Sequence, residues 1–338
     1  MEKKIANILM QSSDYYSTFA GVALTSLFEN NKHFDEINVY FISDNIGTEN
    51  KAKLEKTAEN YGRKLIIIDA KPITEMLENA GVPKYHGSHA TLLKLFVVSY
   101  IKEDIKSLLY IDSDMLVVSK IDELIDTDLD GYVYGMVAHT TAFAYKSIIG
   151  FNDFELWFNG GLLLINIDEW KNKNCEHAFI INITNPNTHL PFVDEDLTNL
   201  VLHNYIKPLD LKFNYPSTYE VIGFEATKRI YKLTESQYNE FKDTSDKVVI
   251  YHSLPIFGLR PWDKKSQAIE KDKWDYYKKI SEWANIEYED KPLSLKNKVE
   301  KALYDFLPTW IYAKMHRTAY LWTVKQAAKG FKYEKGED

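Results

Sequence analysis

The middle of this chain reads Leu108-Leu109-Tyr110-Ile111-Asp112-Ser113-Asp114-Met115-Leu116-Val117-Val118. Two apolar runs, rich in residues typical of strands, flank a pair of carboxylates separated by one serine. Carboxylate oxygens are the ligands that hard divalent cations such as Mg²⁺ and Mn²⁺ prefer. The stretch therefore predicts a strand whose end presents Asp112 and Asp114 to a metal ion, and such a metal could also hold a diphosphate.

The Asp-x-Asp spacing alone is a weak signal, because the chain contains it four times. Two overlapping triplets, in residues 126–130, lie in an acidic turn before Gly131, where solvated surface is the simpler interpretation. Only the central triplet lies between two β-rich apolar runs. Its context therefore favours metal binding, with surface carboxylates as the alternative. The four triplets are Asp112/Asp114, Asp126/Asp128, Asp128/Asp130 and Asp194/Asp196.

Strand and helix patterns alternate along the N-terminal part of the chain. Such alternation predicts an α/β fold with a parallel sheet covered on both faces. Ligands bind sheets of this kind at the carboxyl ends of the strands, where Ser13 and Asp44 would lie. Thr48 is expected to cap the second helix. The predicted strands are 5–10, 37–42, 65–68, 132–138, 162–167 and 248–251, together with the strand that begins at Leu108 and ends at the two aspartates. The predicted helices are 16–29, 48–61, 89–101 and 194–203.

Length and composition indicate a well-packed globular chain of 338 residues, 45% of them hydrophobic and 14% aromatic. The single cysteine, Cys175, excludes an intrachain disulfide and fits a reducing, cytoplasmic compartment. The first apolar run is broken by Asn7 and Gln11, which argues against a signal peptide. No stretch approaches the roughly 20 apolar residues of a membrane span. A net charge of −8 argues against a nucleic-acid partner.

The chain changes character near residue 290. Residues 296–332 contain eight Lys and Arg but two acids, a local balance of +6 in a chain of net charge −8. Pro308 is expected to divide this segment into two helices. We therefore expect residues 1–290 to form the main domain and residues 291–338 to form a basic, aromatic helical tail.

Six short motifs occur in an order that resembles the retaining glycosyltransferases of family 8, over roughly residues 5–265. The resemblance implies a Rossmann-like GT-A fold that binds a nucleotide-diphospho-sugar. It also implies bound Mn²⁺ or Mg²⁺ and a UDP-glucose or UDP-galactose donor. The motifs are the first strand with its turn Gln11-Ser12-Ser13-Asp14, the central Tyr-Ile-Asp-Ser-Asp-Met-Leu-Val stretch, Phe158-Asn159-Gly160-Gly161, Asp194-Glu195-Asp196-Leu197, Phe213-Asn214-Tyr215, and His252 followed by Gly258-Leu259-Arg260-Pro261-Trp262.

The resemblance assigns the metal to Asp112, Asp114 and His252. Two hard oxygens and one imidazole nitrogen suit Mn²⁺, and the metal would neutralise charge on the departing UDP. Taken without the other motifs, His252 would be an ordinary histidine at the end of a strand.

The resemblance assigns two basic residues to the diphosphate. Lys94 stands where the family has an arginine, and a lysine holds a phosphate as a point charge instead of a bidentate fork. A solvated helix lysine is the alternative. Arg260 stands where the family has a lysine and could hold the diphosphate bidentately. Ser13 replaces a carboxylate expected near the uracil, on which Tyr15 is expected to stack. The other residues assigned to the nucleotide are Gln11, Ser113 and Gly258.

The resemblance also implies residues at the sugar end of the donor. Asn159 and Gly160 match residues that face the sugar, and Asp194 matches a carboxylate that binds sugar hydroxyls. Glu195 stands next to the anomeric carbon, where relatives often have glutamine. Because a glutamate could attack covalently, we hypothesise that Glu195 is either a nucleophile or an electrostatic stabiliser of the oxocarbenium-like state. A surface helix glutamate is the alternative.

We therefore expect a metal-dependent, retaining hexosyltransferase that acts on a glycan or lipid-linked acceptor at the inner face of the plasma membrane. The basic and aromatic tail suits an anionic lipid surface, and packing on the domain or a dimer contact is the alternative. Residues 139–155 and 215–225 are expected to contact the acceptor. The rival class is a non-catalytic nucleotide-sugar-binding or scaffold protein with the same fold.

Overall fold

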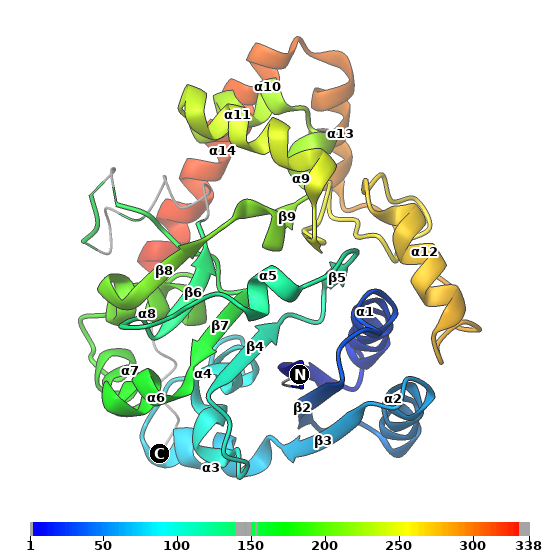
Figure 1. Ribbon diagram of the computed structural model, residues 1–338. Coiled ribbons are helices and arrows are strands. Elements are labelled where there is room, and N and C mark those ends of the chain that lie inside the picture. The colour runs from blue at the N-terminus through cyan, green and yellow to red at the C-terminus, as the bar shows by residue number, and fades with distance from the viewer. Residues whose placement is uncertain (1–2, 139–145, 147–149, 153–154, 189, 331–338) are drawn as a thin grey trace.

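The computed structural model describes residues 3–138, 146, 150–152, 155–188 and 190–330. The strands are β1 (Ile5–Ser13), β2 (Glu36–Asp44), β3 (Lys64–Asp69), β4 (Ser107–Ile111), β5 (Met115–Val117), β6 (Tyr134–Val137), β7 (Leu162–Asn166), β8 (Ile206–Leu209), β9 (Tyr215–Pro216) and β10 (Ile250–His252). They form a seven-stranded sheet in the order β3-β2-β1-β4-β7-β6-β8 and a small three-stranded sheet in the order β5-β10-β9 (Figure 1).

Helices cover both faces of the larger sheet. They are α1 (Ser17–Asn30), α2 (Thr48–Asn60), α3 (Lys71–Asn79), α4 (Leu93–Phe96), α5 (Asp122–Ile125), α6 (Ile167–Asn172), α7 (Cys175–Ile183), α8 (Val193–Leu202), α9 (Thr218–Val221), α10 (Phe224–Tyr231), α11 (Glu235–Thr244), α12 (Lys271–Ile280), α13 (Leu295–Phe306) and α14 (Thr309–Gly330). Side chains of β4 alternate between the two cores, since successive residues of a strand point to opposite faces. Leu109 and Ile111 pack with α1, α2 and the small sheet, and Leu108 and Tyr110 pack with α3, α4, α7 and α8. The predicted two-sided α/β architecture is confirmed.

The prediction of a parallel sheet holds except at β7, and β6 and β8 in the far half are again parallel. β1 runs parallel to β2 and β4, and β2 runs parallel to β3. β7 instead runs antiparallel to both β4 and β6. A strand buried on both faces is a continuous apolar run in either direction, so the sequence pattern carried no sign of this reversal.

The central stretch forms two strands in two sheets. The prediction that a strand ends at the two aspartates is confirmed, whereas nothing in the sequence indicated that the second apolar run joins another sheet. β4 ends at Ile111, and a turn closed by the Met115 N–H to Asp112 O hydrogen bond of 3.2 Å follows it. β5 then pairs antiparallel with β10, with Met115 opposite His252. This pairing brings a residue from late in the chain beside the two aspartates.

Two local predictions are corrected. Residues 89–101 do not form one helix, because α4 lies between 3₁₀ turns at Ala90–Leu92 and Val97–Tyr100. Residues 92–98 are all buried, so this segment lacks the polar face of an amphipathic helix. Thr48 is the first residue of α2 and not its cap. Gly47 occupies the cap position, and its N–H donates to Asp14 Oδ1 at 2.8 Å.

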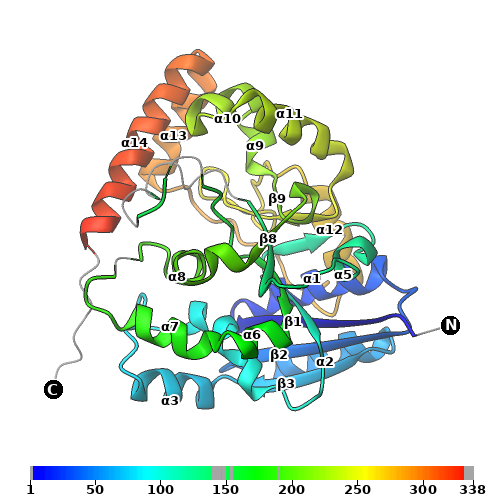
Figure 2. The ribbon, with the colours of Figure 1, turned by 60° about the vertical axis from the view of Figure 1, so that its left-hand side comes forward.

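The C-terminal segment forms α13 and α14, which Pro308 separates as predicted. Tyr312 and Ala313 pack into a small apolar cluster with residues of α10, and α14 lies beside α10 (Figures 1 and 2). Trp310 and Trp322 are 59% and 64% exposed. Within the described ranges, we find no helix whose length and apolar character suffice to cross a membrane.

Candidate active site

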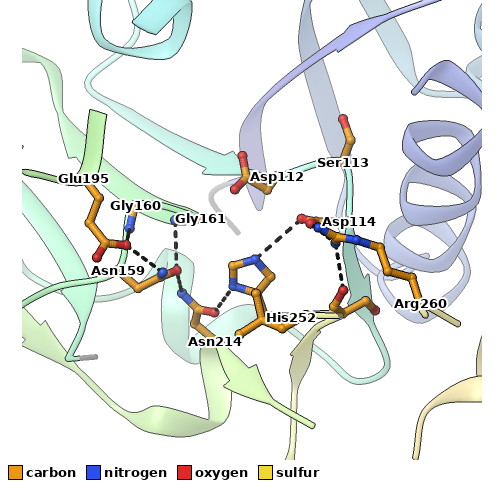
Figure 3. A network of polar contacts seen from close by, with 12 residues as sticks. Asp112, Ser113, Asp114, Asn159, Gly160, Gly161, Glu195, Asn214, His252 and Arg260 are labelled. Atoms are coloured by element: carbon orange, nitrogen blue, oxygen red, sulfur yellow. Dashed lines mark hydrogen bonds and ion pairs between the residues drawn. The ribbon is translucent and has the colours of Figure 1, made fainter. Parts of the chain in front are cut away.

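The predicted metal ligands converge where β4 ends and β10 ends. Asp112, Asp114 and His252 each offer one ligand atom, and these atoms all lie within 4.8 Å of one another. His252 Nε2 lies 3.5 Å from Asp114 Oδ1 (Figure 3). The position of His252 follows from its pairing with Met115, which directly follows Asp114 in the chain.

The donor set fits a divalent cation. Asp114 Oδ1 is buried and accepts no hydrogen bond from the part of the chain that the structure describes. A buried acceptor without a donor is costly, and a cation between Asp114 and His252 would satisfy it. Two carboxylates with one imidazole provide the hard oxygens and the nitrogen that Mn²⁺ accepts. The three residues could therefore hold such an ion.

Lys94 is a buried part of this site and not the solvated helix lysine considered as the alternative. Its side chain is 4% exposed. Its Nζ lies 2.7 Å from Asp194 Oδ2, 2.7 Å from the Gly160 carbonyl oxygen and 3.8 Å from Asp112 Oδ1. Burial opposes the charged form of Lys94, but Asp112 and Asp194 outweigh burial and raise its pKa. Lys94 thus links the metal ligands to the predicted sugar-binding carboxylate.

Arg260 contacts the other aspartate. Its Nη1 donates to Asp114 Oδ2 and, at 2.8 Å, to the Ser253 carbonyl oxygen. The guanidinium lies over the Trp262 ring, 5.3 Å from the ring centroid. Arg260 therefore reaches the edge of the metal site, with its side chain 25% exposed.

The pKa values of the two aspartates are shifted in opposite directions. Burial raises the pKa of the Asp112 carboxyl to about 7, although the Lys94 ammonium opposes this shift. Burial also acts to raise the pKa of Asp114, but His252 and Arg260 outweigh it and hold that pKa below its usual range. Tyr110 donates a hydrogen bond from its hydroxyl to Asp112 Oδ1.

Glu195 faces the site from the first turn of α8, so the alternative of a free surface glutamate is wrong. Trp157 Nε1 donates to its Oε1 at 2.9 Å. Asn159 Nδ2 donates to its Oε2 at 2.9 Å, and the Gly160 N–H donates to the same oxygen at 3.3 Å. N–H donors to both oxygens suit an acceptor-only carboxylate.

A pocket of about 370 Å³ opens beside the aspartates. It lies at the carboxyl ends of β1 and β4, as expected for ligands of an α/β sheet. The Gln11 side chain also donates to the Ala90 carbonyl oxygen at 3.1 Å, and Ser113 donates to the Gln11 carbonyl oxygen. The lining includes the predicted residues Gln11, Ser13, Asp112, Ser113 and Asp114, and also Tyr16.

Tyr15 and Gly258 line a second pocket, of about 390 Å³, together with Arg260. Tyr15 is 57% exposed, and its hydroxyl donates to Glu289 Oε1 at 3.3 Å. The structure therefore places Tyr16, and not Tyr15, in the pocket beside the aspartates. Gly258 has a φ of +79°, in the region that favours glycine. A Cβ at Gly258 would lie 1.9 Å from the side chain of Asn297 in α13, so no larger residue fits there.

The sequence interpretation missed several residues of the site. Trp157 and Tyr110 gave no signal, because apolar runs contain aromatic residues for packing alone. Asn214 belongs to a recognised motif but had no assigned role, although its Oδ1 lies 2.9 Å from His252 Nδ1. The predicted acceptor segment 139–155 lies largely outside the described residues, whereas the β9–α9 segment is described.

Comparisons with known proteins identify the family of this chain. The sequence profile of the family described as Glycosyl transferase family 8 matches residues 7–266. General stress protein A of Bacillus subtilis is 26% identical over 84% of this chain and 96% of that protein. A lipopolysaccharide 1,2-glucosyltransferase of Escherichia coli is 25% identical over 90% of this chain and 87% of that protein.

A solved structure has the same fold. The galactosyltransferase LgtC, crystallised with donor and acceptor sugar analogues, superimposes with a TM-score of 0.67 at 23% identity, over 82% of this chain and 96% of LgtC. LgtC is therefore similar to this chain in its GT-A architecture. Taken with the profile match over most of the sequence, these findings show that the chain belongs to glycosyl transferase family 8 and is a retaining hexosyltransferase.

Proposed function

We propose that this enzyme transfers glucose or galactose from a UDP-sugar to a glycan or lipid-linked acceptor, and that the transfer depends on Mn²⁺ or Mg²⁺. The observation that carries the proposal is the convergence of Asp112, Asp114 and His252 beside a pocket at the strand ends. Relatives named for lipopolysaccharide glucosyl transfer support the acceptor class.

The metal would be held by Asp112, Asp114 and His252. When bound, it supplies positive charge that stabilises the departing diphosphate. Asp114 Oδ1 accepts no hydrogen bond within the described residues, which supports this assignment. Arg260 would bind the diphosphate. Its guanidinium, which pairs with Asp114 here, lies close enough to the metal ligands to turn to a diphosphate oxygen.

The donor sugar would lie against α8 and the loop before β7. Lys94 fixes Asp194 at 2.7 Å, which orients this carboxylate toward sugar hydroxyls. Gly160 has no side chain, and a Cβ there would come 3.3 Å from Asp194 Oδ2, so the glycine keeps this surface open. Asn159 and Gly160 would thus form the surface that contacts the sugar.

Glu195 would act as an electrostatic stabiliser of positive charge at the anomeric carbon. Trp157, Asn159 and the Gly160 N–H engage both of its carboxylate oxygens. These hydrogen bonds make an oxygen lone pair less nucleophilic but leave the negative charge in place. This arrangement supports front-face attack within an ion pair over a covalent intermediate.

A panel of UDP-sugars tests the proposal directly. We expect release of UDP from UDP-glucose or UDP-galactose only when Mn²⁺ or Mg²⁺ is present. Binding of UDP-sugar without hydrolysis or transfer, under every metal condition, would instead favour the rival function of a non-catalytic binding or scaffold protein.

We further propose that the tail, residues 291–338, binds an anionic membrane at the cytoplasmic face. Residue 290 is the proposed boundary between the tail and the main domain. Exposed Leu295, Phe306, Trp310 and Trp322, with the basic residues of α13 and α14, support this role. Flotation on vesicles containing phosphatidylglycerol should recover the full chain but not a chain ending at residue 291. Equal flotation of both chains would contradict it and would leave packing or dimerisation as the function of the tail.

A further inference from the structure

A line of hydrogen bonds connects Glu195 to the metal site (Figure 3). Asn159 Nδ2 donates to Glu195 Oε2 at 2.9 Å. Asn214 Nδ2 donates to Asn159 Oδ1 at 2.7 Å. Asn214 Oδ1 lies 2.9 Å from His252 Nδ1. Two amides therefore stand between the carboxylate at the sugar end and the imidazole at the metal end, and we call Glu195, Asn159, Asn214 and His252 the amide relay.

The direction of each amide follows from its neighbours. The backbone N–H of Gly161 can only donate, and it points to Asn159 Oδ1 at 3.0 Å. A carboxylate can only accept, and Glu195 faces the other end of the same amide. Both contacts require the Asn159 oxygen to face Gly161 and its nitrogen to face Glu195. Asn159 thus has one permitted orientation.

The orientation of Asn159 fixes the next two groups. Asn159 Oδ1 is an acceptor, so the Asn214 atom beside it must be the donor Nδ2. The opposite end of Asn214 is then its oxygen, which faces His252. The histidine must carry a hydrogen on Nδ1 to complete this contact. When that imidazole is neutral, Nε2 therefore has the lone pair, on the side of Asp114, 3.5 Å away.

Burial shields the metal end of the relay. Asn214 is 4% exposed and His252 is 6% exposed, so water has little access to compete for these hydrogen bonds. Gly161 closes the arrangement: a Cβ at this position would lie 2.7 Å from His252 Cε1 and 3.0 Å from Asn159 Oδ1. Its carbonyl oxygen also accepts the Asp112 N–H at 2.9 Å. One glycine thus contacts both the relay and a carboxylate ligand.

We propose that Asn214, oriented by Asn159, is a positioning residue that holds His252 in the Nδ1–H form so that Nε2 is ready to bind the metal. This inference rests on the proposed metal dependence. The relay also connects the metal ligand to Glu195, so that the metal and sugar ends of the site share one hydrogen-bond network. Loss of such an outer partner typically costs about 10- to 100-fold in metal affinity.

Two substitutions at one position separate positioning from simple disruption. Asn214→Leu removes the acceptor for His252 Nδ1–H, and we expect about 10- to 100-fold weaker Mn²⁺ binding. Asn214→Asp keeps that acceptor but loses the donor to Asn159, and we expect Mn²⁺ affinity within about threefold of wild type. Free Mn²⁺ measured by electron paramagnetic resonance during titration of each protein gives these affinities.

Asn38→Leu is the matched control. Asn38 donates to Asn7 Oδ1 at 3.1 Å, between β2 and β1 and outside the proposed site, so its loss should leave Mn²⁺ affinity unchanged. Circular dichroism checks that each variant is folded. Wild-type affinity in Asn214→Leu would overturn the proposal. An Asn214→Asp protein as weak as Asn214→Leu would also overturn it, because the acceptor would then have no special role.

A second measurement does not depend on the metal. Nitrogen-15 labelling of the nine histidines allows the tautomer of His252 to be read by nuclear magnetic resonance in metal-free protein, at a pH where imidazoles are neutral. We expect Nδ1–H in wild type and in Asn214→Asp, and loss of this preference in Asn214→Leu. An Nε2–H form in wild type would overturn the relay. Failure of wild type to bind Mn²⁺, with the Nδ1–H form present, would contradict the proposed metal dependence and leave the relay supported.

Discussion

Asp112 and Asp114 are separated by one residue, yet they face two different cations. Lys94, beside Asp112, is 4% exposed, and it also contacts Asp194 and the Gly160 carbonyl. Arg260, beside Asp114, is 25% exposed and lies at the rim of a pocket. We call these the lysine side and the arginine side. The lysine side is a fixed part of the fold, whereas the arginine side can exchange partners.

This difference indicates how ligands would enter. A cation approaching Asp114 Oδ1 meets a carboxylate whose other oxygen, Oδ2, already pairs with the Arg260 guanidinium. Because two cations on one carboxylate repel each other, we expect Arg260 to turn away as the metal binds. Lys94 need not move, because its buried contacts include two carboxylates. Metal and diphosphate would thus rearrange the arginine side while the lysine side keeps the sugar-binding carboxylate in place.

The largest effect on stability should come from the lysine side. Lys94→Met removes the buried cation that half-buried Asp112 and Asp194 share, which should cost up to about 3–5 kcal/mol in the free energy of unfolding. Urea denaturation of metal-free protein measures this loss. Lys53→Met is a control, because Lys53 pairs with a Glu49 side chain that is 83% exposed, and an ion pair of this kind contributes less than about 0.5 kcal/mol. Equal losses in the two variants would remove the distinction between the two sides.

The arginine side should respond in two opposite directions. Arg260→Gln removes a competitor for Asp114, so we expect about three- to tenfold tighter Mn²⁺ binding, comparable to the energy of one partly exposed ion pair. The same variant loses charged hydrogen bonds to the diphosphate and should bind UDP about 10- to 100-fold more weakly. Calorimetric titration with each ligand tests both effects. Parallel weakening of Mn²⁺ and UDP would show that Arg260 does not compete with the metal.

A smaller effect is expected at the end of the lysine side. Glu195→Gln keeps an acceptor for Asn159 with its amide oxygen but turns its NH₂ toward the Trp157 Nε1–H, and it removes the negative charge that we propose lies near the anomeric carbon. We expect about a tenfold to hundredfold lower kcat, with little change in donor KM, as for loss of one electrostatic contact in a transition state. Undiminished turnover would contradict a role for the charge. Turnover lost beyond about 10⁴-fold, with a sugar adduct on the wild-type residue, would favour a nucleophile.

The sequence predicted the first half of the fold better than the second. β1, β2 and β3 alternate with helices α1 and α2, whose apolar residues recur at helical spacing, so the type and order of these elements were readable. The direction of β7 was not, because a strand buried on both faces has no directional pattern. The break at the two aspartates was readable, but the sequence did not indicate that Met115 to Val117 belong to another sheet, since they resume an apolar run of the same kind.

Site residues could be recognised from the sequence where a polar residue type is unusual for its surroundings, as for Asp112 and Asp114 between apolar runs. His252, Lys94 and Arg260 needed the family resemblance, because single basic residues are ordinary in any sequence. Trp157 could not be found and Asn214, although part of a recognised motif, received no role, since the roles of both come from contacts with residues 38 positions away. Tyr16 lines the pocket beside the aspartates as well as the second pocket, whereas Tyr15 lines the second pocket alone, so stacking of Tyr15 on the base stays a prediction.

The central claim is that Asp112 and Asp114 hold the metal that binds the donor. Calorimetric titration of UDP-sugar, with and without Mn²⁺, tests it in wild type, Asp112→Ala and Asp114→Ala. We predict that wild type binds the donor tightly only with Mn²⁺, and that each substitution abolishes this Mn²⁺-dependent binding. Mn²⁺-dependent donor binding and transfer that survive either substitution would contradict the account.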